Sequence, residues 1–507
     1  MSQGRTLYLE TMGCQMNALD SELTLGALMA DGYRVTEDMA AADLVVLNTC
    51  SVRQHAEDKV YSRLGNLKRP ADRNAQQIVA VIGCMAERDG DGLIEKMPHV
   101  DILCGPGELH RLPSLIHDVR STHGRAVALS GRLRDRSTGV RHVPAHDDLE
   151  SLDSGRTFGR TAHAATPKVF GRHQAYVRIT RGCNKYCTFC VVPYTRGPER
   201  HRPPGQIVEE VRRLAASGVV EVTLLGQTVN HYRYPADSGA GETSFADLLR
   251  RVHDEVPELP RLRFVTSFPR DFTDEALEVM AASPRICKYL HIPAQSGSDT
   301  VLKRMNRGYT AEEYLSLLER ARSIMPDICL AGDMIVGFSG ESEADFLLSM
   351  DLLREAKYKN CFIFKYSPRP DTVADNRLPD DVPDEEKRRR NNDMLSLQAG
   401  ISLANNRAML DRTVEVLAEG PSKSAIKAQE SEQTRGQEVD PQATLRDQLV
   451  GRTQGDQIVV FNGALEMVGR IMTITITAAT PYTLHGDVAD TGAAPSPTGH
   501  SLTVVGN

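Results

Sequence analysis

Three of the ten cysteines, Cys183, Cys187 and Cys190, lie within eight residues of one another and must share one loop. Cysteines with three and then two residues between them can hold three irons of a cubane [4Fe-4S] cluster through their thiolates, which leaves the fourth iron without a protein ligand. A structural zinc ion would need four ligands, and no fourth Cys or His lies close by in the loop. The spacing therefore favours an iron-sulfur cluster over a zinc site.

An iron without a protein ligand can chelate the amino and carboxylate groups of S-adenosylmethionine. Electron transfer from such a cluster cleaves a carbon-sulfur bond and gives a 5′-deoxyadenosyl radical, which removes hydrogen from carbons that no side-chain base can deprotonate. The cysteine spacing, directly after a strand-like segment, resembles the radical S-adenosylmethionine superfamily. This resemblance implies an enzyme that uses S-adenosylmethionine.

A second set of cysteines, Cys14, Cys50 and Cys84, is scattered along the chain, but each member follows an apolar run that is expected to be a strand. The carboxyl ends of parallel strands share one edge of a sheet, so these three thiols should meet. One cysteine at such a place is more often a small buried hydrophobe, whereas three at matching strand ends indicate ligands of a second [4Fe-4S] cluster. The remaining cysteines are expected to pack structurally: Cys104, Cys287, Cys329 and Cys361.

The elements that position these cysteines can be read from hydrophobic periodicity. Apolar runs alternate with helix-like segments in the first part of the chain, at residues 7–10, 44–47, 78–82 and 100–103. This alternation predicts a parallel sheet in a doubly wound α/β domain over residues 4–120. A linker rich in His, Arg, Asp, Ser and Gly is expected over residues 121–168.

Six further strand-like runs, most of them separated by helices, follow in residues 169–405. They predict a partial (β/α)6 barrel with its active site at the carboxyl ends of the strands, and the alternative is a second doubly wound sheet. Residues 408–488 have the short strands and turns of a small all-β domain, with a polar insertion at residues 424–446. Residues 489–507 are expected to be a disordered tail.

The composition sets limits on function. With 507 residues, 40% of them hydrophobic and 25% charged, the chain is typical of a soluble multidomain protein, and we expect no membrane association. Its first residues lack the features of a secretory signal, which predicts a cytoplasmic protein. The net charge of −7 means that nucleic-acid binding would need local basic patches. Candidates around the barrel mouth are Arg196, Arg200, Arg202, Lys303, Arg304 and Arg307.

The order of these parts resembles the methylthiotransferase family of radical S-adenosylmethionine enzymes, which ends in a small RNA-binding β-domain of the TRAM type. The cysteines at 14, 50 and 84 match the ligands of that family's second cluster, which is implicated in supplying the inserted sulfur. The stretches at 14–17, 51–53, 191–197 and 226–230 most resemble the branch that makes 2-methylthio-N6-isopentenyladenosine in tRNA.

This resemblance implies methylthiolation at C2 of isopentenylated adenosine 37 of tRNA, with two [4Fe-4S] clusters and S-adenosylmethionine as cofactors. It also implies an electron donor such as flavodoxin or ferredoxin, and a sulfur donor. One alternative is a sibling enzyme that acts on threonylcarbamoyladenosine in tRNA or on a ribosomal-protein aspartate. The other is a noncatalytic iron-sulfur protein that binds RNA.

Overall fold

The computed structural model describes residues 5–51, 54–67, 76–130, 150, 152–153, 173–236, 239, 241–427 and 448–489. The chain divides into two compact units: the first holds Met1–Asn405 with Gln454–Asp456, and the second holds Asn406–Thr453 with Gln457–Asn507. No helix in the described ranges is long and apolar enough to cross a membrane.

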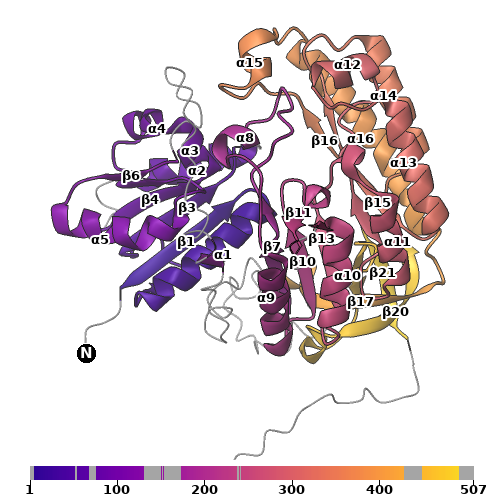
Figure 1. Cartoon of the computed structure of the whole chain (residues 1–507), viewed down its shortest axis with the longest axis horizontal. Coiled ribbons are helices and arrows are strands. Elements are labelled where there is room, and N and C mark those ends of the chain that lie inside the picture. Colours follow the sequence, from indigo (N-terminus) through magenta and orange to yellow (C-terminus); the bar gives the residue numbers. More distant parts are fainter. Residues whose placement is uncertain are drawn as a thin grey trace, which may run out of the picture. The chain divides into compact units, whose positions relative to one another are not determined.

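The first unit begins with a six-stranded parallel sheet, coloured indigo and purple in Figure 1. Its strand order is β2-β1-β3-β4-β5-β6. The strands are β1 (Thr6–Met12), β2 (Arg34–Val35), β3 (Leu44–Thr49), β4 (Ile78–Gly83), β5 (Ile102–Cys104) and β6 (Ala126–Ala128). The helices are α1 (Gln15–Ala30), α2 (Gln54–Leu67), α3 (Cys84–Asp89), α4 (Asp91–Lys96) and α5 (Leu112–Thr122).

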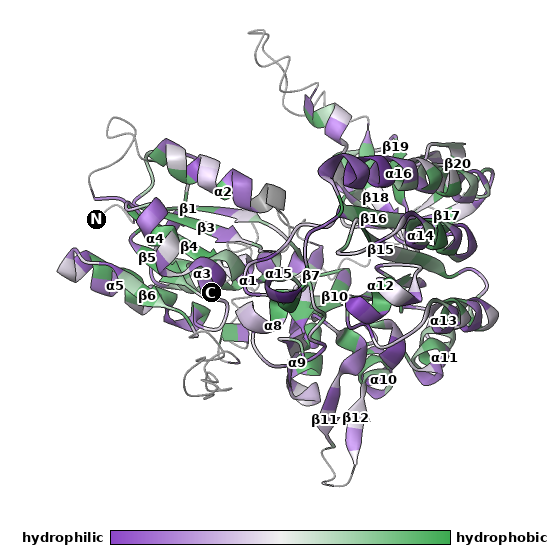
Figure 2. Cartoon of the chain, turned by 90° about the horizontal axis from the view of Figure 1, so that it is seen from above, coloured by the Kyte–Doolittle hydropathy of each residue, from purple (hydrophilic) through white to green (hydrophobic). Residues whose placement is uncertain are grey.

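Helices cover both faces of this sheet, which confirms the predicted doubly wound arrangement. Val46 and Ala80 pack with residues of α1 and α5 on one face, while their neighbours Val45 and Val79 pack with residues of α2, α3 and α4 on the other. A strand buried on both faces needs apolar residues at every position, and β3 is buried throughout. The ribbons of α2 and α5 in Figure 2 carry both purple and green residues, as helices on the outside of such a sheet should.

The first domain extends further than the sequence analysis predicted. Strand β6 pairs with β5, so the sheet includes residues that were expected to begin the linker. Strands β2 and β6 were also not predicted, because runs of two or three residues give no periodic signal. The rest of the expected linker, from residue 131 to 168, lies outside the described residues except for 150 and 152–153.

Six parallel strands follow at the predicted places, in two runs ordered β13-β10-β7 and β14-β15-β16. A parallel bridge between Leu262 and Ile286 brings the two runs together. The partial barrel is therefore present. Its strands are β7 (Gln174–Arg178), β10 (Glu221–Leu225), β13 (Arg261–Val265), β14 (Tyr289–His291), β15 (Cys329–Val336) and β16 (Asn360–Lys365).

Several outer helices of the barrel begin after a Ser or Thr residue that caps the first helical turn. Ser244, Thr310 and Ser342 each accept a hydrogen bond from a backbone amide of the first helical turn, and a carboxylate three residues later returns the bond. This reciprocal capping satisfies donors that a helix start leaves unpaired. The helices are α9 (Pro204–Ala216), α10 (Phe245–Glu255), α11 (Asp274–Ala282), α13 (Ala311–Ile324), α14 (Glu343–Ala356) and α16 (Asp384–Arg407).

The second unit contains a closed five-stranded barrel in the order β17-β18-β19-β21-β20. Its interior is apolar, with Val416, Phe461 and Ile474 almost fully buried. The strands are β17 (Thr413–Pro421), β18 (Leu449–Thr453), β19 (Ile458–Phe461), β20 (Ile471–Ala479) and β21 (Leu484–Val488). Most of the predicted insertion, residues 428–446, and the predicted tail, from residue 490 onward, lie outside the described residues.

Candidate active site

The loop with Cys183, Cys187 and Cys190 follows a two-residue strand, β8 (Thr180–Arg181), at the carboxyl end of β7. Gly182 has a φ of 75°, and a Cβ atom there would collide with the carbonyl oxygen of Pro198. The loop therefore folds back on the hairpin that β8 forms with β9 (Arg200–His201). A hydrogen bond of 3.1 Å from the amide of Cys183 to the carbonyl of Gly197 holds the loop against this hairpin.

A segment after the fourth barrel strand holds the other side of the cysteine loop. The amide of Thr188 donates to the carbonyl of Met305 at 3.0 Å, and the side chain of Asn306 donates to the carbonyl of Tyr186 at 3.1 Å. Backbone groups of the loop are thus paired with a rigid neighbour, so the loop is shaped without help from a ligand.

The three thiols of this loop are in different surroundings. Cys187 Sγ accepts a hydrogen bond of 3.3 Å from Arg307 Nη1, and Cys183 Sγ lies 3.7 Å from the hydroxyl of Thr228. Burial raises the pKa of Cys183 and of Cys190. Without a metal these two thiols are therefore protonated at neutral pH, and binding a metal would release their protons.

The second set of cysteines meets as predicted. Strands β1, β3 and β4 are neighbours in the sheet. Cys14 precedes α1, Cys50 follows β3 and Cys84 begins α3, so all three lie at the carboxyl edge. A Cβ atom on Gly13 would come within 2.5 Å of the Cβ atom of Cys50. The absence of a side chain at Gly13 is what lets these strand ends approach.

The thiols of this second set affect one another's pKa values. A hydrogen bond with Cys50 lowers the pKa of Cys14 to about 6, against the effect of burial, and the charge of Arg196 adds to the lowering. Burial raises the pKa of Cys84, and Arg196 opposes that rise. Cys104, by contrast, is fully buried at the end of β5, and its thiol donates to the carbonyl of Gly105 at 3.7 Å.

Both trios have a donor set that fits a cubane cluster better than a single metal ion. All six thiols are free of disulfides. Sulfurs bound to one zinc ion at about 2.3 Å would lie about 4 Å apart. In the described part of the chain, no cysteine belongs to a group of three ligand atoms within 4.8 Å of one another. Each trio supplies three thiolates, and in a polynuclear cluster each of them can bind a separate iron.

A buried charge network connects the two trios, and the sequence analysis missed it. The Asp20 carboxylate is fully buried and accepts hydrogen bonds from Arg196 Nη2 at 2.7 Å and from Arg178 Nη1 at 3.1 Å. Arg178 also pairs with Asp153 at 2.7 Å. Arg196 comes six positions after Cys190, yet its charge acts on Cys14 and Cys84. It therefore joins the cysteine loop of the barrel to the strand ends of the first sheet.

Three arginines predicted to bind phosphate are buried instead. Arg196 pairs with Asp20, Arg202 pairs with Glu150 and Glu210, and Arg307 donates to the tyrosine hydroxyl at 309. Buried charges are paired in this way because desolvation is costly. Sequence shows the charge of an arginine but not its surroundings, and this prediction was wrong for these three residues.

Other polar groups gather at the ends of neighbouring barrel strands. Thr180 Oγ1, Gln227 Oε1 and Ser267 Oγ follow β7, β10 and β13, and each is buried without a hydrogen-bond partner among the described residues. Unpaired buried polar atoms are costly, and a polar ligand would satisfy them. Gly226 is next to this group, where a Cβ atom would collide with Thr180 Oγ1.

Three parts of the sequence match known families. Residues 6–105 match the uncharacterized protein family UPF0004, residues 177–353 match the radical SAM superfamily, and residues 439–489 match the TRAM domain. The radical SAM methyltransferase TsrM from Kitasatospora setae has a similar fold, with a TM-score of 0.50 and 17% identity. The likeness covers 74% of each chain.

Curated relatives cover nearly the whole chain. A protein from Rhodopirellula baltica is 44% identical over 96% of both chains, and one from Phocaeicola vulgatus is 40% identical over 96% of both chains. A relative from Syntrophotalea carbinolica is 38% identical over 94% of this chain and 98% of its own. All three are named tRNA-2-methylthio-N(6)-dimethylallyladenosine synthase. Identity at this level over this length shows that the chain belongs to the family of tRNA-2-methylthio-N(6)-dimethylallyladenosine synthases.

Proposed function

We propose that the chain transfers a methylthio group to C2 of isopentenylated adenosine 37 in tRNA, with S-adenosylmethionine and two [4Fe-4S] clusters as cofactors. The observation that carries this proposal is the presence of two separate cysteine trios in one compact unit, bridged by Arg196. A radical enzyme that only cleaves S-adenosylmethionine needs one trio. A second trio has a use when sulfur must also be delivered.

Under this proposal, Cys183, Cys187 and Cys190 hold the cluster that binds S-adenosylmethionine, and Cys14, Cys50 and Cys84 hold the cluster that handles sulfur. The cofactors supply the radical that activates C2 and the methyl group that ends on sulfur. The protein positions these groups. Thr180, Gln227 and Ser267 offer unpaired polar atoms that suit the sugar and base of a nucleoside.

The arginine beside each trio has an electrostatic role. Arg307 donates to Cys187 and also to the carbonyl of Pro293 at 3.0 Å, so its position is fixed on two sides. Arg196 is fixed by Asp20. Each guanidinium favours extra negative charge on the thiolates nearby, because opposite charges attract strongly where water is excluded. Both arginines would therefore ease reduction of a cluster held at their site.

The partners follow from the same chemistry. The tRNA substrate agrees with the TRAM match in the second unit and with the names of the relatives. An electron donor such as flavodoxin or ferredoxin would have to reduce the clusters, and a sulfur donor would have to replace the sulfur that each turnover consumes. Action on tRNA also supports the proposal that the protein is cytoplasmic.

The proposal is tested with three alanine variants of the full chain, reconstituted anaerobically with iron and sulfide. Cys187→Ala should abolish 5′-deoxyadenosine formation. Cys50→Ala should keep that activity and lose methylthiolated nucleoside, measured by mass spectrometry of digested tRNA. Cys104→Ala is the matched control, because it removes a buried thiol at the end of the same sheet and should keep both activities.

Iron counting gives these variants a readout that does not depend on activity. Each trio variant should hold about half the iron of the parent chain, since one cubane is lost and the other stays. Equal loss of 5′-deoxyadenosine in Cys50→Ala, with the iron of the first trio intact, would contradict separate roles. A tRNA that carries threonylcarbamoyladenosine and becomes methylthiolated would favour the sibling enzyme instead.

A further inference from the structure

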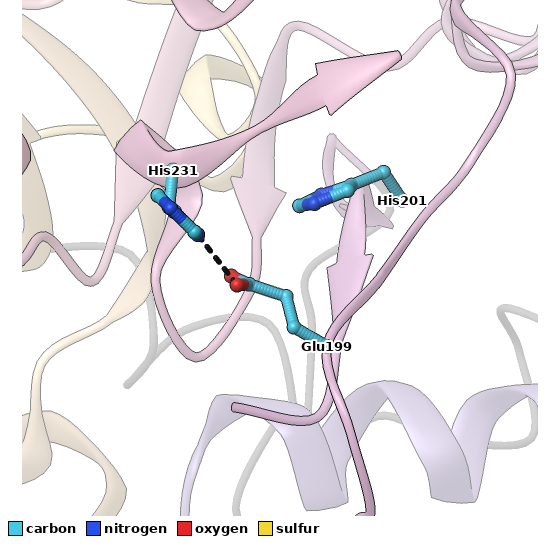
Figure 3. A group of neighbouring side chains, drawn as sticks. All are labelled: Glu199, His201 and His231. Atoms are coloured by element: carbon cyan, nitrogen blue, oxygen red, sulfur yellow. Dashed lines mark hydrogen bonds and ion pairs between the residues drawn. The ribbon is translucent and has the colours of Figure 1, made fainter. Parts of the chain in front are cut away.

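Two histidines and a glutamate meet beside the barrel mouth, outside both cysteine trios. Glu199 and His201 belong to the hairpin of β8 and β9, and His231 ends the short helix η3 (Val229–His231) after β10. Figure 3 shows the three side chains turned toward one another. His231 Nδ1 lies 2.5 Å from Glu199 Oε2, and one ligand atom from each residue lies within 4.8 Å of the other two.

The surroundings hold these side chains in place. The amide of Glu199 donates to the side-chain oxygen of Asn184 at 3.2 Å. The ring of His201 meets the ring of Tyr232 edge to face, with centroids 5.5 Å apart. Tyr232 is itself anchored, because its hydroxyl donates to the carbonyl of Arg202 at 2.7 Å. The cluster is therefore built from fixed elements, as a metal site requires.

A simple ion pair between His231 and Glu199 would explain one contact and leave two atoms unexplained. Glu199 Oε1 and His201 Nδ1 are both buried, and neither has a hydrogen-bond partner among the described residues. A buried polar atom of this kind destabilises the folded chain when it is left unpaired. Both atoms can donate a lone pair to a cation, so a bound ion would remove both costs at once.

From this geometry we infer that Glu199, His201 and His231 bind a single divalent transition-metal ion, for which Zn²⁺ is a suitable probe. Two imidazoles and one carboxylate are a common set of three protein ligands, and such sites keep a further position for water or another ligand. The Glu199 side chain is only 2% exposed, whereas His231 is 32% exposed, so solvent would reach such an ion from the His231 side.

The ion would fasten two segments that also shape the first cysteine loop. His231 comes three positions after Thr228, whose hydroxyl lies 3.7 Å from Cys183 Sγ. Glu199 comes two positions after Gly197, whose carbonyl accepts from the Cys183 amide. A metal ion that bridges the hairpin and η3 would therefore keep both contacts of Cys183 in place. This positioning role is separate from the proposed methylthiolation chemistry.

The test is metal analysis of the full chain with its iron-sulfur clusters in place, exposed to excess Zn²⁺ and then desalted. Zinc and iron are counted per chain, and zinc X-ray absorption identifies the neighbouring atoms. We expect one zinc with nitrogen and oxygen neighbours at about 2.0–2.1 Å. His201→Gln and His231→Gln should each lower zinc affinity by at least about tenfold, because each removes one ligand. Their iron content should not change.

His253→Gln is the matched control, since His253 also pairs with a carboxylate, that of Asp254 at 3.0 Å, but has no second histidine. It should bind zinc like the parent chain. Sulfur neighbours at about 2.3 Å would mean that zinc occupies the cysteines, and would overturn the inference. So would zinc binding that survives both histidine variants, or no uptake of zinc by a chain that holds its full complement of iron.

Discussion

Replacing Asp20 by asparagine should open the contact between α1 and the cysteine loop of the barrel. The Asp20 carboxylate is fully buried and pairs with two arginines, but these arginines do not depend on it equally. Arg178 keeps Asp153 as a second partner. Arg196 has no second carboxylate: its Nη1 is buried without a hydrogen-bond partner in the described residues, and its remaining side-chain partner is the thiol of Cys84. Removing the Asp20 carboxylate therefore affects Arg196 more than Arg178.

The expected free-energy cost of Asp20→Asn follows from these contacts. Removing one partner of a buried ion pair costs about 3–5 kcal/mol, because the other charge stays buried and unpaired. The hydrogen bond of 2.7 Å between Arg196 and Asp20 is short and charge-assisted, so the full cost should apply. Since 1.4 kcal/mol is a factor of ten, local opening should become about two to four orders of magnitude more frequent.

Hydrogen exchange followed by mass spectrometry measures that opening directly, on peptides from Gln15–Ala30 and Val192–Thr195. The double variant Asp20→Asn with Arg196→Met should lose less than the sum of the single variants, with a coupling of at least about 2 kcal/mol. Strictly additive effects, or less than a tenfold change in the α1 peptides, would refute the assignment. Methylthiolated product should fall more than 5′-deoxyadenosine, because Arg196 lies beside the trio that is proposed to handle sulfur.

Three further predictions concern single residues. Burial raises the pKa of Glu87 to about 8, so its stabilising contribution is full below about 4.5 and is lost as pH rises through about 8; urea unfolding of Glu87→Gln should lack this pH dependence. Gly182→Ala should cost the chain about half its iron, because the new Cβ collides with the Pro198 carbonyl and distorts only the first cysteine loop. Arg307→Gln should make the potential of the adjacent cluster more negative in a redox titration monitored by electron paramagnetic resonance, since Cys187 loses a cationic donor.

Most of the fold could be predicted from the sequence because its strands are continuous apolar runs. The runs that became β3 and β4 are buried along their whole length, as strands covered by helices on both faces require. Strands β2 and β6 escaped prediction for the opposite reason. Short edge strands are defined by their neighbours, and their own residues carry little signal.

The candidate ligands were also predictable, because cysteine spacing and strand-end position are properties of sequence. The buried charged residues beside these ligands could not be predicted. Asp20 and Arg196 are separated by 176 positions, and nothing in either local sequence indicates the other. Arg196 and Arg202 were therefore taken for surface phosphate ligands. Lys387 and Arg390 are likewise buried, and Arg390 pairs with Glu341 at 2.8 Å.

The position of Arg196 limits how far apart the two sites can be. It comes six positions after Cys190, and helix α8 (Val192–Thr195) lies between them. Six residues span about 20 Å even when fully extended, and a helical turn shortens that reach. Because the Arg196 side chain reaches the trio at Cys14 and Cys84, the two trios cannot lie further apart than this segment and one arginine allow. One short segment of the barrel domain thus limits the separation of the two sites, and a reaction that needs a radical and a sulfur at the same carbon requires that the sites be close.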